Sequence, residues 1–432
     1  MKRTLQAASL ALMLIALTLA AQAAPSAAAA DSAAVTKLKE SISKELVALA
    51  DTASDNGLNG KAETFLKEAL VLTPDDRKAT KALEKLPDET DTSDADAIAK
   101  YDKKAEKTLK KASQAYCLLF NELFDDKDNS IADACLTRAY ELHAETADKW
   151  VEGEYRARYG KKDYASTHRI LDLVQGVQLD DEKQNAARTK ALIECEAELS
   201  FRTPLLKTCR THTMKYYLSL PRGWTADKKW PVYVAVEGAG SNFLGACNGG
   251  RGKDNDTFIV VTPCGFTNTN ELNEGMRKKY PYPDDLITEA DKDRMGFDDA
   301  GLCAVIKDLQ ELYNAQEKVC ITGFSGGGIL TWHMVFAHPD MLVAAVPACG
   351  NFAGARAVSD DAEAKKALII HAYQGDKDEY KESMLDAQWE AAKKLAEDNG
   401  YEHVTRDIVP GGHMGCHSYA REVFRKALGL DE

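Results

Sequence analysis

The chain has 432 residues, and its 68 acidic residues outnumber its 55 basic residues, for a formal net charge of −13. A hydrophobic fraction of 44% is enough for globular cores and excludes a disordered chain, while the acidic balance excludes a basic nucleic-acid-binding protein. The 12 prolines and 28 glycines exclude a fibrous or low-complexity architecture. At roughly 100–200 residues per domain, we expect two folded units.

The first segment, residues 1–23, has the pattern of a signal peptide. Two basic residues precede an apolar stretch, Leu5 to Ala20, and a small-residue cleavage site follows at Ala21 to Ala23. The alternative is a membrane anchor, but the apolar stretch falls short of the ~20 residues that span a bilayer, and no later segment is long enough. We therefore expect an exported protein, periplasmic or extracellular, without stable membrane insertion.

Export makes disulfides among the ten cysteines plausible, because an oxidising compartment permits them and the count is even. We expect one to three disulfides of undetermined connectivity. No CxxC pair occurs, so zinc-ribbon and thioredoxin-like interpretations have no support. Cys320 and Cys349 stand in apolar runs, where buried thiols are the alternative.

A flexible leader is expected over residues 24–34, followed by a helical domain over residues 35–203. Ala62 to Asp76 has helical spacing, and a helix before it ends near Gly57, so the pair resembles one tetratricopeptide-type hairpin. The 34-residue period of such arrays does not recur. This half either binds a protein partner, covers a cleft or serves as a helical spacer. Further helices are expected over Ala105 to Phe124, Ile131 to Glu145 and Glu182 to Leu199.

Residues 204–432 alternate between short β-rich runs and helical stretches, which is typical of an α/β fold with a mostly parallel sheet flanked by helices. The expected strands are His212 to Leu220, Val232 to Val236, Phe258 to Val261, Lys318 to Thr322, Val343 to Pro347, Ala367 to Ala372 and Val404 to Val409. The expected helices are Asp299 to Tyr313, Gly326 to Ala337 and Met384 to Asn399.

A G-x-S-x-G motif, Gly323 to Gly327, lies between an expected strand and an expected helix. In that context the central Ser325 occupies a sharp turn that exposes its hydroxyl group, so it is the candidate nucleophile. Side chains at positions 323 and 327 would collide with neighbouring backbone. The helix starting at Gly326 also aims backbone N–H groups at a developing oxyanion.

A nucleophilic serine needs a base and an acid, which follow it in the order Ser, Asp or Glu, His. His413 stands in a glycine-flanked loop after an expected strand and is preferred over His417 as the base. Asp378 is preferred as the acid because Gly375-x-x-Asp378 has the usual strand-end spacing. Asp376 is the alternative acid.

The remaining oxyanion-hole donors are expected in a glycine-rich loop that follows another expected strand. Backbone N–H groups of this loop would act with Gly326; an ordinary tight turn is the alternative. The candidates are Gly238, Ala239 and Gly240.

Residues 212 to 428 resemble the α/β-hydrolase esterases of the polyhydroxybutyrate depolymerase and feruloyl esterase type. The motifs that carry this resemblance are Tyr216 to Pro221, Glu237 to Gly240, Phe297 to Gly301, Gly323 to Gly328, His338 to Asp340 and Gly411 to His413. The resemblance implies a secreted serine esterase without a cofactor, with Ser325, an aspartate and His413 as its triad.

Two positions depart from the pattern of these relatives. Many of them have His-Gly at the position of Glu237-Gly238, and His-Gly is also common where this chain has His371-Ala372. A carboxylate at position 237 would oppose the developing negative charge if it pointed inward. The departure therefore indicates either altered specificity or a weakened enzyme.

We predict an exported serine esterase that acts on polyester, feruloyl or small-ester substrates through an acyl-enzyme, with no metal and no organic cofactor. The alternatives are a serine peptidase of the prolyl-oligopeptidase type and a non-catalytic interaction protein. His417 with Cys416 lacks a third metal ligand, so a metal site there has no support. Four aromatic residues either line a substrate site or pack in the core: Phe324, Trp332, Tyr280 and Tyr282.

Overall fold

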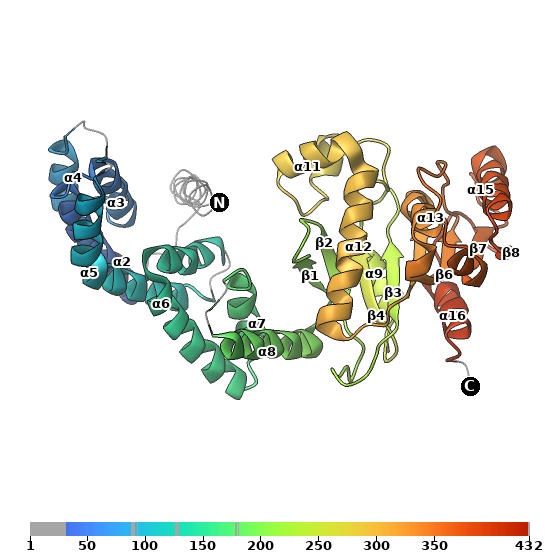
Figure 1. Ribbon diagram of the computed structural model, residues 1–432, viewed down its shortest axis with the longest axis horizontal. Helices are drawn as coiled ribbons and strands as arrows, with labels where there is room; N and C mark the ends of the chain where they lie inside the picture. Colours follow the sequence, from blue (N-terminus) through green and yellow to red (C-terminus); the bar gives the residue numbers. More distant parts are fainter. Residues whose placement is uncertain are drawn as a thin grey trace. The chain divides into compact units, whose positions relative to one another are not determined.

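A computed structural model describes residues 32–87, 91–92, 94–125, 129–177, 179 and 181–430 of the chain. The chain divides into two compact units, Met1–Gly176 and Val177–Glu432 (Figure 1). The expected signal peptide and most of the expected leader lie outside the described residues. Among the helices that are described, none combines the length and the apolar character needed to cross a bilayer.

The first unit is helical, as expected. The predicted hairpin is formed by α2 (Ala33–Ser54) and α3 (Asn59–Leu72), which pack against each other. The remaining helices are α4 (Arg77–Glu84), α5 (Ala95–Glu122), α6 (Asn129–Gly160) and α7 (Tyr164–Leu173). Helix α6 is interrupted by non-helical backbone angles at His143, close to where the sequence predicted a helix end.

A buried carboxylate joins three helices of this unit. Glu68 on α3 accepts hydrogen bonds from the guanidinium group of Arg138 on α6, at 3.0 Å from Nε and 2.7 Å from a terminal nitrogen. The hydroxyl group of Tyr116 on α5 donates to the same carboxylate. Glu68 and Arg138 are almost fully buried, so neither charge is hydrated. Their contact with each other compensates for this loss of hydration.

Helix α8 (Glu182–Ser200) belongs to the second unit rather than to the helical one. Its buried Glu196 pairs with Lys207 and accepts a hydrogen bond of 2.7 Å from the hydroxyl group of Tyr313. The hydroxyl group of Ser219 donates to the carbonyl of Ser200 at 2.9 Å. Because these contacts attach α8 to the sheet domain, the division of the chain falls after residue 176 instead of after residue 203.

The second unit contains one eight-stranded sheet in the order β1-β2-β4-β3-β5-β6-β7-β8. Strands β3 to β8 run parallel, whereas β2 is antiparallel to both β1 and β4. The strands are β1 (Leu205–Thr208), β2 (Lys215–Ser219), β3 (Val232–Val236), β4 (Ile259–Pro263), β5 (Val319–Phe324), β6 (Leu342–Ala348), β7 (Ile369–Gly375) and β8 (His403–Val409). Every expected strand is present, and β1 is an addition.

Helices cover both faces of this sheet (Figure 1). Side chains alternate along β3, so Val232 and Val234 enter one core and Tyr233 and Ala235 the other. The first core includes residues of α12 (Arg294–Tyr313), α13 (Gly328–Ala337) and α15 (Asp386–Asp398). The second includes residues of α9 (Phe243–Arg251) and α16 (His417–Ala427). The expected α/β class is therefore confirmed.

The structure does not contain the expected disulfides. All ten cysteines lie in the described residues, and no disulfide joins any of them. Eight are buried, where a thiol packs as a small apolar group. Burial raises the pKa of Cys117 and of Cys247 to about 12.

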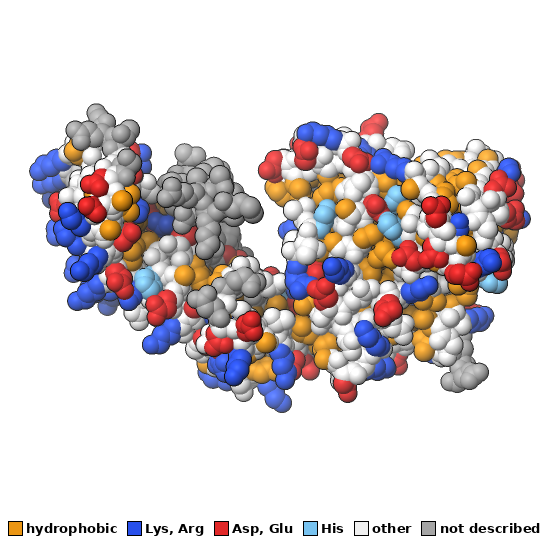
Figure 2. All heavy atoms as spheres, viewed as in Figure 1, with side chains coloured by type: hydrophobic (Ala, Val, Ile, Leu, Met, Phe, Trp, Pro, Cys, Tyr) orange, Lys and Arg blue, Asp and Glu red, His pale blue; other side chains and the backbone are white. Residues whose placement is uncertain are grey.

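On the exterior, acidic, basic and apolar side chains are interspersed over the face seen in Figure 2.

Candidate active site

Ser325 lies at the turn between β5 and α13. Its φ of 50° is in the left-handed region, and residues Ser325–Gly327 form one turn of 3-10 helix before α13 begins. A Cβ at Gly323 would lie 2.3 Å from the carbonyl oxygen of Gly327. A Cβ at Gly327 would lie 2.5 Å from the carbonyl oxygen of Val236. Both glycines are therefore required by backbone contacts, as the motif predicted.

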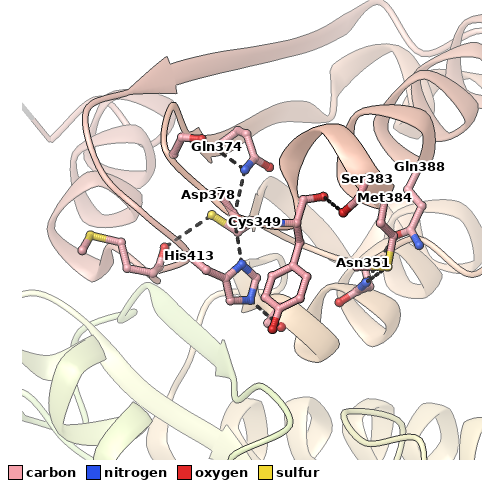
Figure 3. Close-up of polar contacts among 12 residues, drawn as sticks. Cys349, Asn351, Gln374, Asp378, Ser383, Met384, Gln388 and His413 are labelled. Carbon is pink, nitrogen blue, oxygen red and sulfur yellow. Dashed lines mark hydrogen bonds and ion pairs between the residues drawn. The ribbon is translucent and has the colours of Figure 1, made fainter.

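His413 connects Ser325 to Asp378. Figure 3 shows the contact between His413 and Asp378. Its Nε2 lies 2.9 Å from the Ser325 Oγ, and its Nδ1 lies 2.8 Å from the Asp378 Oδ2. Asp376, the alternative acid, instead accepts a hydrogen bond of 2.8 Å from the backbone N–H of Gly411. The structure thus brings together the three preferred residues and gives Asp376 a local role in holding the loop.

The Asp378 carboxylate is held by several donors. Burial opposes its ionisation, but hydrogen bonds from His413, the Tyr380 backbone N–H, Cys349 and the Gln374 amide outweigh burial and lower its pKa. The Tyr380 N–H and the Gln374 amide each lie 2.9 Å from a carboxylate oxygen. An ionised carboxylate at this position fixes the His413 tautomer with its proton on Nδ1.

His417 is placed away from the nucleophile. Its Nδ1 lies 2.9 Å from the Tyr233 hydroxyl group, and its ring lies against Gly249. Burial lowers the pKa of His417 to about 4, so this imidazole is neutral at ordinary pH. The competing base of the sequence interpretation is therefore a half-buried residue that packs against Gly249 and Tyr233.

The Glu237 side chain lies against its own loop. Burial raises its pKa, while hydrogen bonds from the backbone N–H groups of Asn242 and Gly238 oppose that rise. Its side chain faces the loop that contains Ala239 and Gly240, because its Oε1 would lie 3.6 Å from a Cβ at Gly240. The like charge that the sequence placed beside the oxyanion site is directed into the loop backbone, which contradicts the reason for expecting a weakened enzyme.

Residues 227–425 match the family model described as Phospholipase/Carboxylesterase. The family match and the mostly parallel sheet with helices on both faces indicate the same fold. The second unit is an α/β-hydrolase domain. The matched residues make up less than half of the chain. No match was found among curated proteins.

Several solved structures are similar to the α/β-hydrolase domain. A thermostable esterase is 20% identical, with 54% of this chain and 63% of that chain covered and a TM-score of 0.33. The feruloyl esterase module of Clostridium thermocellum is 19% identical, with coverage of 52% and 86% and a TM-score of 0.31. A Bacillus cereus carboxylesterase is 17% identical, with coverage of 50% and 94% and a TM-score of 0.36.

The α/β-hydrolase domain has a cavity of about 550 Å³ beside Ser325 and His413. Three of the four proposed oxyanion-hole residues, Ala239, Gly240 and Gly326, line it. Apart from His413, its lining contains neutral side chains only. These neutral residues are Asn268, Asn270, Phe324, Ile329, Asn351, Phe352, Ala353, Tyr380, Met384 and Gln388.

Of the four aromatic residues considered from the sequence, only Phe324 lines this cavity. Trp332 is buried and stacks on Phe336 with ring centroids 5.9 Å apart. Tyr280 and Tyr282 pack in a separate apolar cluster of the domain. Tyr280 and Tyr282 belong to the core because their cluster offers apolar contacts to the rings and hydrogen-bond partners to the hydroxyl groups.

Sequence reasoning did not identify most of the cavity wall. Asn351 follows the carboxyl end of β6, where parallel sheets place functional groups, so its position was a usable signal. Its amide lies 3.3 Å from the Gln388 side-chain oxygen and 3.6 Å from the Met384 sulfur (Figure 3). Tyr380 packs edge-on against the His413 ring. Asn351 follows β6, and Tyr380, Met384 and Gln388 follow β7, in two segments that contain no recognisable motif.

Proposed function

We propose that this protein is a serine esterase in which Ser325 is the nucleophile, His413 the general base and Asp378 the acid. The observation that carries the proposal is the unbroken chain of contacts, 2.9 Å from Ser325 Oγ to His413 Nε2 and 2.8 Å from His413 Nδ1 to Asp378 Oδ2. This chain opens onto a cavity of substrate size.

In the proposed mechanism, Ser325 Oγ attacks the ester carbonyl while His413 Nε2 takes its proton. Asp378 stabilises the imidazolium that forms. Backbone N–H groups of Gly326 and of Ala239 or Gly240 receive the oxyanion. The imidazolium then protonates the leaving alcohol, and water activated by the same histidine hydrolyses the acyl-enzyme.

We propose uncharged esters as the substrates. The cavity volume admits a short acyl group or one aromatic acid, and its amide side chains can hydrogen-bond to hydroxyl or ether oxygens. The lining offers no cation for a carboxylate and no carboxylate for a peptide amino terminus. This lining favours feruloyl, polyester-type and small esters over the peptides expected for the alternative peptidase.

The test is to treat the protein with a fluorophosphonate probe and to measure hydrolysis of short p-nitrophenyl esters in the same samples. Wild type is expected to be labelled and active, and Ser325→Ala to lose both. The matched control is Ser418→Ala, which removes an exposed hydroxyl group of the same domain outside the cavity lining. A folded wild type that shows neither labelling nor turnover would sink the enzyme proposal and leave the non-catalytic interaction protein.

We also propose that the protein is exported through residues 1–23. Mass spectrometry of the protein secreted from a bacterial host is expected to find an amino terminus near Ala24. An uncleaved amino terminus in the cytoplasmic fraction would contradict export.

A role for the helical unit in binding a protein partner is a further proposal. It is supported by the tetratricopeptide-like pairing of α2 with α3. Crosslinking in the native host should capture the same partner with wild type and with the Ser325→Ala variant. Deletion of residues 35–176 should abolish that capture.

A further inference from the structure

A second group of functional side chains lies outside the proposed triad. Asp299 is on α12, His333 is on α13, and His338 follows the end of α13. The His338 Nε2 is 2.7 Å from the Asp299 Oδ1, and the His333 Nε2 is 3.1 Å from the same oxygen. One ligand atom from each residue lies within 4.8 Å of the other two. Two imidazoles and one carboxylate therefore converge on a single point.

Hydrogen bonding alone does not account for this arrangement. His338 forms a hydrogen bond with Asp299, whereas the Nε2 of His333 lies 3.1 Å from the same oxygen without hydrogen-bond alignment, although the residue is only 6% exposed. A buried polar atom without a partner is costly and requires an explanation. An ion at the convergence point would satisfy this nitrogen as well as the carboxylate.

The surrounding atoms indicate which ion fits. The Cys303 Sγ lies 4.0 Å from the Asp299 Oδ1 and 3.8 Å from the Met341 Sδ, so sulfur flanks the nitrogen and oxygen ligands. Imidazole nitrogen with nearby sulfur suits a borderline ion such as Zn²⁺, whereas Mg²⁺ and Ca²⁺ require more oxygen ligands. Asp299 and His338 have side chains about one third exposed, which gives an ion access from solvent.

The distances are close to those that Zn²⁺ requires. Bonds of about 2.0–2.1 Å in a tetrahedron separate neighbouring ligands by roughly 3.3 Å, so the contact of His338 with Asp299 has to lengthen by roughly 0.6 Å and that of His333 by roughly 0.2 Å. The nearby Arg356 disfavours a cation, but its charge is partly compensated by Asp293 at 2.6 Å. A bound Zn²⁺ would take a water molecule as its fourth ligand.

We propose that Asp299, His333 and His338 form a zinc site that ties α12 to α13. His333 follows Ser325 by eight residues, about 12 Å of helical rise, and His338 lies farther along, directly after α13. The site is therefore structural and takes no part in the ester chemistry. It requires both imidazoles neutral, with the proton of each on Nδ1.

The test uses full-length protein without a histidine tag, stripped with a chelator and titrated with Zn²⁺ alone in equilibrium dialysis. We expect one Zn²⁺ per chain, an increase in Tm of about 3 °C or more, and no displacement by excess Mg²⁺ or Ca²⁺. Asp299→Asn and His338→Ala lie at the partly exposed side of the site, so both are expected to fold; each should weaken binding at least roughly tenfold.

His371→Ala is the matched control. The His371 Nε2 lies 3.2 Å from the Asp407 Oδ2 in the same domain, and this pair has a single imidazole. Its removal should leave zinc affinity unchanged. Absence of saturable zinc binding below about 100 μM would overturn the proposal, and so would equal binding by wild type, Asp299→Asn and His338→Ala.

Discussion

Replacing the proposed acid with its amide tests the geometry of the candidate triad. In Asp378→Asn, the side chain keeps its size but loses the charge that faces the His413 Nδ1 at 2.8 Å. The amide can also donate to Nδ1, which places the imidazole proton on Nε2 and removes the acceptor that Ser325 needs. Two effects therefore act together, loss of the ion pair and the wrong tautomer.

The magnitude follows from the burial of this pair. With charge centres about 4 Å apart and an effective dielectric constant near 20, the carboxylate stabilises the imidazolium by about 4 kcal/mol. At about 1.36 kcal/mol per factor of ten, that is roughly a thousandfold in rate. The wrong tautomer increases the loss, so kcat should fall about 10³- to 10⁴-fold.

The assay is turnover of a short p-nitrophenyl ester, with labelling by the fluorophosphonate probe as a second readout and Tm as the test of folding. Asp376→Asn is the matched control, because Asp376 contacts the Gly411 N–H and not His413. The control should keep its rate within about threefold, since an amide oxygen can still accept that hydrogen bond. A larger loss in Asp376→Asn than in Asp378→Asn would refute the assignment of the acid.

Three further predictions concern other parts of the chain. Glu237→Ala should lower kcat about tenfold at unchanged Tm, because the oxyanion loop loses a restraint; steady-state kinetics would detect it. Glu68→Ala should destabilise the helical unit by about 3–5 kcal/mol in denaturant unfolding, because Arg138 stays buried and unpaired, whereas Glu63→Ala on the exposed surface should cost under about 1 kcal/mol. An equal effect of both would contradict the burial argument. His417 binds a proton more readily when unfolded, so stability should fall as pH drops from about 6.5 to about 4, by about 3 kcal/mol. In His417→Gln this part of the pH dependence should vanish, and an unchanged profile would refute it.

Local sequence patterns predicted most of the sheet domain. The alternation and apolar runs located seven strands, because a buried parallel strand needs an unbroken row of apolar side chains. The turn at Ser325 was predictable for the same kind of reason, since Gly323 and Gly327 have no space for a Cβ. The edge strand β1 was missed because it has only four residues and one buried side chain.

Contacts between distant segments were harder to predict. Asp376 and Asp378 are two residues apart, and only the approach of the loop after β8 decides that Asp378 meets His413. The cysteines show the same limit, because an even count and expected export indicated disulfides, whereas the fold distributes these residues among separate elements. The direction of the Glu237 side chain likewise depends on the fold of its loop.

The sequence by itself therefore determined the α/β class, the nucleophile turn and the chain order of the candidate triad, because each follows from backbone sterics and side-chain period within a few residues. Tertiary structure alone decided which aspartate contacts His413, which aromatic residue lines the cavity and that Asp299 meets His333 of α13 and His338 after it. These outcomes depend on how elements far apart in the chain pack, and side-chain contacts of that range leave no local pattern.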